Sequence, residues 1–183
     1  MSYQTSKALL ILGELNSDDL HWIRRVGRKE ILEPGQTLIY EGQNISALYI
    51  VISGMLSVFL GEKELARIEA GEAVGEISFI DNRFPIATVK AIQESIVFVI
   101  PRLQLTFKLQ KDMGFASRFY HGISLCLADR MRGTVRRLGY GFELEKPEAV
   151  ENEKPSQVEL EHLALAKAKF NWLINCLVPS SVT

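Results

Sequence analysis

Hydrophobic residues occur in short, closely spaced runs through the middle of the chain. Residues 48–52, 55–60 and 95–100 are rich in β-branched and aromatic side chains, which is typical of buried strands. Turn signals separate the runs, and they include Gly35, Gly42, Gly54, Gly61 and Gly71. Short strands at this spacing predict antiparallel hairpins that close into a roll or barrel over residues 28–101.

Helical spacing flanks this β region on both sides. Residues 1–27 are predicted to be helical, with Asn16 and the acids after it as the cap of a second helix. Pro101 ends the last strand, and residues 102–138 then predict two helices. The second has apolar residues at a three-four spacing, and it ends at the glycines of 139–141.

The C-terminal part of the chain differs in composition. Residues 142–161 hold seven Glu and two Lys with two prolines, which predicts a solvated linker. An amphipathic helix follows at about 158–178, with an apolar stripe of Phe170, Trp172, Ile174 and Leu177. We expect this stripe to fold back within the protein or dimer, against the oppositely charged helix before the linker. A protein partner for the stripe is the alternative.

These patterns divide the chain into four parts and indicate an α+β fold. The parts are an N-terminal helical segment (1–27), the β-roll (28–101), two following helices (102–141), and the acidic linker with its amphipathic helix (142–183).

Composition favours a soluble, cytoplasmic protein. The 183 residues have a net charge of −1, so nothing attracts the whole chain to nucleic acid or anionic membranes. No signal peptide and no apolar run of about 20 residues is present. Cys126 and Cys176 fit buried, reduced thiols. The three histidines lack metal-ligand spacing and no nucleophile has a base beside it, so we expect no metal site and no enzyme.

One segment carries recognisable chemistry. In residues 71–79, Gly71 favours a tight turn, Gly75 permits a close backbone approach, and Glu76 opens a short helix. A helix N-terminus presents backbone N–H groups to an anion, and the Glu76 carboxylate accepts a hydroxyl. Phosphate and hydroxyl together point to a ribose phosphate. The alternative is that Glu76 only caps the helix.

The segment resembles the phosphate-binding cassette of cyclic nucleotide-binding domains, the family of the bacterial catabolite activator and the protein kinase A regulatory subunits. The resemblance covers roughly residues 10–138 and implies a jelly-roll-like antiparallel β-roll with N-terminal helices. It also implies a long C-terminal helix, residues 112–138, as the seam of a homodimer. The ligand-binding positions that it implies in the cassette are Gly75, Glu76, Ile77, Ser78, Ile86, Ala87 and Thr88.

In the family, the cassette Glu accepts the ribose 2′-hydroxyl, and N–H groups at positions matching Ile77 and Ser78 hold the cyclic phosphate. The family arginine that neutralises this phosphate falls here on Pro85, which offers neither charge nor donor. Arg83, in the same loop, is one substitute, with a solvated loop charge as the alternative. Arg130 and Thr134 match helix positions that reach the nucleotide in the bacterial activator, and a salt bridge on a basic helix surface is the alternative for Arg130.

Three functions remain open at this point. The first is a stand-alone regulatory sensor of the cyclic nucleotide type, with cAMP as one ligand and no other cofactor. The second is a dimeric scaffold or adaptor with a degenerate pocket, which Pro85 favours. The third is a transcription regulator of the catabolite activator type that acts without a DNA-binding domain of its own. We expect no DNA binding by this chain, because the segment after the long helix is acidic and supplies no basic recognition helix.

Overall fold

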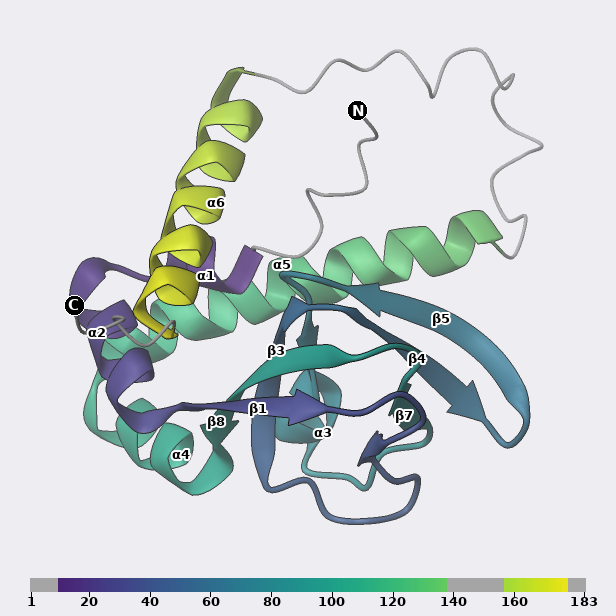
Figure 1. The fold of residues 1–183 in the computed structure, drawn as a ribbon. Helices are drawn as coiled ribbons and strands as arrows, with labels where there is room; N and C mark the ends of the chain where they lie inside the picture. The colour runs from purple at the N-terminus through teal and green to yellow at the C-terminus, as the bar shows by residue number, and fades with distance from the viewer. Residues whose placement is uncertain (1–9, 138–156, 178–183) are drawn as a thin grey trace, which may run out of the picture.

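A computed structural model describes residues 10–137 and 157–177 of the chain (Figure 1). Within them, strands form two four-stranded antiparallel sheets with the orders β1-β8-β3-β6 and β2-β7-β4-β5. The strands are β1 (Arg28–Leu32), β2 (Thr37–Ile39), β3 (Ala47–Ser53), β4 (Met55–Leu60), β5 (Lys63–Glu69), β6 (Ala73–Val74), β7 (Thr88–Ala91) and β8 (Ser95–Pro101). The antiparallel β-roll expected for residues 28–101 is therefore confirmed.

Helices cover one side of this roll (Figure 1). They are α1 (Leu10–Glu14), α2 (Ser17–Val26), α3 (Glu76–Asp81), α4 (Arg102–Lys111), α5 (Met113–Arg137) and α6 (Gln157–Leu177). The helices predicted on both flanks of the roll are present, and the fold is α+β as expected. Asn16 and Asp19 form a capping box at the start of α2, each side chain accepting the other's backbone N–H. The predicted helix stop at 139–141 and the linker up to residue 156 lie outside the described residues.

Strands β3 and β8 are buried on both faces, which explains their continuous apolar sequences. Alternate residues of β3 point in opposite directions. Leu48 and Ile50 belong to the core beneath the helices, whereas Tyr49 and Val51 belong to the core between the two sheets. The central strands therefore join two apolar cores into one folded unit.

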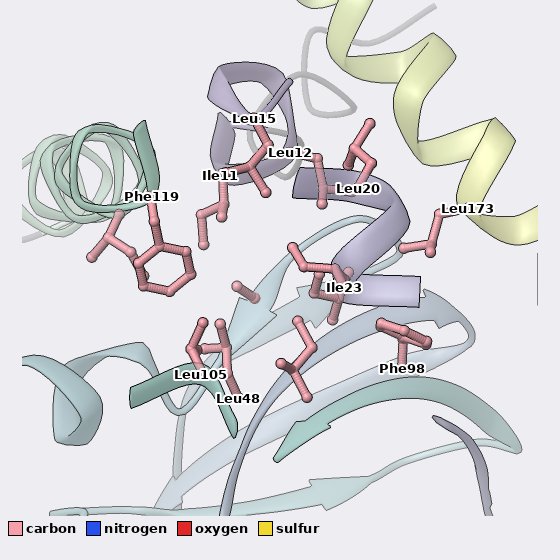
Figure 2. Packing of buried hydrophobic residues seen from close by; sticks show 14 of the residues in the cluster. Ile11, Leu12, Leu15, Leu20, Ile23, Leu48, Phe98, Leu105, Phe119 and Leu173 are labelled. Carbon is pink, nitrogen blue, oxygen red and sulfur yellow. The ribbon is translucent and has the colours of Figure 1, made fainter. Parts of the chain in front are cut away.

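The core beneath the helices brings together segments that are far apart in the sequence. Figure 2 shows α1, α2, α5 and α6 side chains meeting above β3 and β8. Its labelled members are Ile11, Leu12, Leu15, Leu20, Ile23, Leu48, Phe98, Leu105, Phe119 and Leu173. A partly buried salt bridge adds to this packing, because the guanidinium of Arg118 on α5 binds both carboxylate oxygens of Asp19 on α2, at 2.6 and 2.9 Å.

Helix α6 returns to the body of the protein and packs against α1 and α2 (Figure 1). Leu173 is fully buried, and Lys169 donates a hydrogen bond to the carbonyl of Gly13. The predicted apolar stripe of α6 is part of the core or packs against it. The expected fold-back occurs, but the docking site differs from the expected one. Apolar packing on α1 and α2, rather than charge attraction to the basic helix, accounts for the position of α6.

None of the helices in the described part of the chain is both long enough and apolar enough to cross a membrane.

Candidate functional site

The helix of the cassette is preceded by a glycine that no other residue replaces without strain. Gly75 has φ +92°, in the left-handed region, and a Cβ there would lie 3.2 Å from the carbonyl oxygen of Ala47. Helix α3 starts at the next residue, Glu76, as the sequence predicted. The N-cap residue, Gly75, has no side chain to bond the first N–H groups of α3, which are those of residues 76–78 and the ones nearest the expected phosphate.

Glu76 is almost fully buried, at 1% exposure, and a charged side chain at such a position needs a partner. Arg130 of α5 supplies it, because its Nη1 donates a hydrogen bond to the Glu76 Oε1. The Arg130 Nη2 also donates to the carbonyl of Ala73, on strand β6 just before α3. The fold thus brings together two predicted site residues that lie 54 positions apart.

The environment of this pair holds Arg130 in its charged form. Burial by itself lowers the pKa of the Arg130 guanidinium, but the negative charges of Glu76 and Glu72 outweigh burial and raise the pKa above its ordinary value. Cys126 lies one turn earlier on α5, and burial raises the pKa of its thiol to about 11. At neutral pH the site therefore holds an ionised arginine beside a protonated thiol.

A second arginine, Arg102, attaches the other end of the cassette helix to α4. Its Nη1 and Nη2 both donate to the Ser78 carbonyl at 3.1 Å, and its Nη2 also donates to Asn82 Oδ1 at 2.8 Å. Its guanidinium lies 5.2 Å from the ring centroid of Phe79. A cation at the C-terminus of a helix is favourable for the helix dipole. Both ends of α3 are therefore tied by arginines to the two helices that follow the roll.

The remaining predicted positions surround this centre to different degrees. Ser78 is buried, Ala87 is half-buried, and Ile77 and Ile86 are exposed. The hydroxyl of Thr88 accepts a hydrogen bond from the Glu41 N–H at 3.2 Å. The hydroxyl of Thr134 donates to the Arg130 carbonyl at 2.9 Å, one turn back along α5.

The two candidate substitutes for the missing cassette arginine differ in position. Arg83 is exposed, and its backbone N–H donates to Asp81 Oδ1 at 3.0 Å. Pro85 is half-buried, and its carbonyl accepts from the Gly42 N–H at 2.9 Å, so it closes the loop rather than contributing charge. Of Arg83 and Arg130, it is Arg130 that contacts the cassette carboxylate.

Sequence reasoning missed Arg102 and the carbonyl of Ala73. The one local signal for Arg102 was its position directly after Pro101, where a strand gives way to a helix. A backbone carbonyl has no signature in a sequence, so the contact of Ala73 was not predictable.

In the described part of the chain, no cluster of three His, Cys, Asp or Glu residues is arranged to hold a metal. The arrangement is suited to binding an anion with a hydroxyl beside it.

Comparison with known proteins identifies the kind of domain that contains the cassette. Residues 29–112 match the family model described as "Cyclic nucleotide-binding domain". A cAMP-dependent protein kinase regulatory subunit of Mucor circinelloides f. lusitanicus is 26% identical over 98 residues, which are 54% of this chain and 23% of that protein. A cGMP-dependent protein kinase of Eimeria tenella is 29% identical over 85 residues, which are 46% of this chain and 8% of that protein. The chain thus spans less than a quarter of the length of either relative.

Among solved structures, a cyclic nucleotide-binding domain from Methylobacillus flagellatus superimposes with a TM-score of 0.63. The alignment covers 72% of this chain and 80% of that one, at 18% identity, and so it shows a common fold. Residues 29–112 match the cyclic nucleotide-binding domain family, and the chain shares the fold of a solved domain of that kind.

Proposed function

We propose that this chain is a regulatory sensor that binds a cyclic nucleotide between the cassette and α5. The observation that supports the proposal most strongly is the contact of Arg130 with the buried Glu76 and with the carbonyl of Ala73. Through this contact a guanidinium from α5 reaches the cassette, whereas Pro85 occupies the loop position of the family arginine.

In this proposal the two charged residues have separate roles. The Glu76 carboxylate has two oxygens, and Arg130 contacts Oε1. A carboxylate accepts several hydrogen bonds, so the ribose 2′-hydroxyl donates to Glu76 while the guanidinium remains close. Arg130 has five N–H donors, and the phosphate takes those that face it. The ligand is then held by α3 and α5 together.

The same contacts offer a route by which binding would be transmitted. Arg130 belongs to α5, and Arg102 links the far end of α3 to α4. A ligand that changes the position of α3 or of Arg130 therefore acts on both helices. Such a ligand shifts the protein toward the conformation that it binds better. We propose a change in the α5 surface as the output.

The proposal is tested by isothermal titration of the full chain with cAMP and cGMP, the nucleotides named by the two curated relatives. We expect Arg130→Ala to weaken binding by a factor of about 30 to several thousand, the usual cost of removing one partner of a buried charge pair. Arg83→Ala is the matched control and leaves binding within about twofold. Loss of binding in Arg83→Ala alone would assign the phosphate contact to Arg83 and overturn the role of Arg130.

A second function is favoured by a specific observation. Glu76 already has its charged partner inside the chain, and Pro85 supplies no cation, so the cassette is electrostatically satisfied without a ligand. Under this alternative the protein is an adaptor or scaffold with a closed pocket, or a transcription regulator that works through a partner. The same titration decides between the functions. An absence of binding by the wild-type protein up to millimolar cAMP and cGMP supports the adaptor and rejects the sensor for these ligands.

A further inference from the structure

A groove of about 600 Å³ lies where α2, α4 and the start of α5 meet. It belongs to the part of the molecule that the cassette does not use. The apolar and basic side chains that line it are Trp22, Arg25, Phe107, Lys108, Lys111 and Met113.

Helix α4 is apolar on two sides, which a helix at a protein surface does not require. Leu105 and Leu109 are buried in the core, at 0% and 7% exposure. Leu103 and Phe107, one turn apart, are 66% and 52% exposed on another face. Met113, at the start of α5, is 78% exposed. A surface helix normally has one apolar stripe, and a second exposed stripe beside a groove is typical of an interaction site.

The charges around the groove are predominantly positive. The Lys108 ammonium lies 5.8 Å from the ring centroid of Trp22, and Asp112 fixes it there with a 2.7 Å salt bridge. Arg25 and Lys111 are exposed, and neither forms a salt bridge within the described part of the chain. Since Asp112 neutralises Lys108, two cations remain available at the edge of an apolar groove.

We propose that this groove binds an acidic segment of a partner protein. An apolar side chain of the segment inserts among Trp22, Phe107 and Met113, while its carboxylates face Arg25 and Lys111. Two observations favour a peptide over a nucleic acid or a membrane. The chain as a whole has a net charge of −1, so no extended field attracts a polyanionic surface. The apolar side chains line a concave groove, which fits a protruding side chain better than a flat bilayer.

Helix α6 does not cover this groove. Two neighbouring residues of α2 face different surroundings. The ring centroid of His21 lies 5.0 Å from that of Trp172 on α6, whereas Trp22 lines the groove. Helix α6 therefore covers one side of α2 and leaves the other side available to a partner.

The test uses the full chain and a fluorescein-labelled peptide of about 12 residues that alternates Glu with Leu and Phe. Fluorescence anisotropy measures its binding beside that of a peptide with Gln in place of each Glu. We expect the acidic peptide alone to bind, with an affinity that falls steeply as NaCl is raised from about 50 to 500 mM. In a Trp172→Phe background, Trp22 is the remaining tryptophan, and its emission should change when the acidic peptide binds.

Charge-reversal variants locate the binding site. Arg25→Glu and Lys111→Glu should each weaken peptide binding about tenfold or more. Lys63→Glu, an exposed cation on the β5 hairpin, is the matched control and should bind as the wild type does. Circular dichroism and thermal melting verify that the variants fold.

Three results would overturn the proposal: no binding of the acidic peptide, equal binding of the Gln peptide, or no effect of either groove variant. Sedimentation with phosphatidylserine vesicles provides a further comparison. If the chain binds these vesicles through Lys111 and does not bind the peptide, the groove is a membrane contact instead.

Discussion

Arg130 determines more of the site than any other side chain, because it satisfies two buried acceptors at once. The carboxylate of Glu76 is 1% exposed and the side chain of Arg130 is 28% exposed, so both groups have left most of their water. A buried carboxylate without a partner is costly, and the additional hydrogen bond to the Ala73 carbonyl orients the guanidinium. Under the proposed function, a ligand at the cassette shares this arginine or displaces it, and its binding is thereby coupled to α5.

The first prediction concerns the stability of this pair. Arg130→Met should lower the free energy of unfolding by about 3 kcal/mol, because it leaves the Glu76 carboxylate buried and unpaired. We place the effect near the low end of the usual range because Arg130 is partly exposed. Adding Glu76→Gln to Arg130→Met should recover most of the loss. Urea denaturation of the two single variants and the double variant measures the coupling, and strictly additive effects would contradict it.

The second prediction concerns the thiol next to Arg130. Since burial raises the pKa of Cys126 to about 11, a fraction of only about one in a thousand is thiolate at pH 8, and the thiolate is the reactive form. In a Cys176→Ser background, we expect alkylation by iodoacetamide to be slow at pH 8 and to become about tenfold faster per pH unit toward pH 11. Rapid labelling of Cys126 at neutral pH would show that α5 leaves the cassette more readily than the packing indicates.

At the scale of elements, α1 lies between α5 and α6 and connects them. Gly122 of α5 contacts the backbone of α1, because a Cβ on Gly122 would lie 2.8 Å from the Ile11 Cα. On the other side, a Cβ on Gly13 would lie 3.2 Å from the Ala166 Cβ of α6. A short helix of this kind, Leu10–Glu14, is too small to be stable by itself and depends on both neighbours. The position of α6 therefore depends on α5 through α1.

The third prediction tests this contact. Gly122→Ala should lower the free energy of unfolding by about 1 to 3 kcal/mol, because the added methyl meets backbone that has no room to move. Gly114→Ala is the control in the same helix. There the added methyl lies 3.2 Å from the end of the Arg118 side chain, which needs to shift only by a few tenths of an ångström, and alanine is the better helix former. Equal melting temperatures for the two variants would contradict the close packing of α1 on α5.

The sequence allowed these elements to be predicted to different degrees. The capping box at Asn16 and the runs that became β3, β4 and β8 were predictable because their signals are local. The docking of α6 was predicted against the wrong surface, because charge patterns do not indicate where Leu173 and Ala166 find complementary apolar partners. The Glu76–Arg130 contact was accessible only through the resemblance to a family, whereas Arg102 had no comparable signal.

For the molecule as a whole, α5 contacts the cassette with one residue and exposes apolar side chains on another face. Arg130 points to the cassette, whereas Met131 and Val135, one turn apart, are 70% and 37% exposed. Figure 1 shows α5 as the longest described helix, extending along the roll beyond the region that α1 and α6 cover. An apolar pair on this open stretch is where the homodimer proposed for residues 112–138 would form its seam.

The last prediction tests this seam and its link to the ligand. Met131→Glu combined with Val135→Glu should convert a dimer into a monomer, because four like charges would meet across a two-fold interface that excludes water. Size-exclusion chromatography with light scattering measures the mass, and Leu165→Glu, at an exposed leucine of α6, is the control that should leave the dimer intact. A wild-type protein that is monomeric at about 100 µM, well above the usual dissociation constants of stable dimers, would reject the seam. If the sensor mechanism is also correct, cyclic nucleotide changes the dimer dissociation constant of the wild type but not that of Arg130→Ala, since Arg130 connects the cassette to the helix that forms the seam.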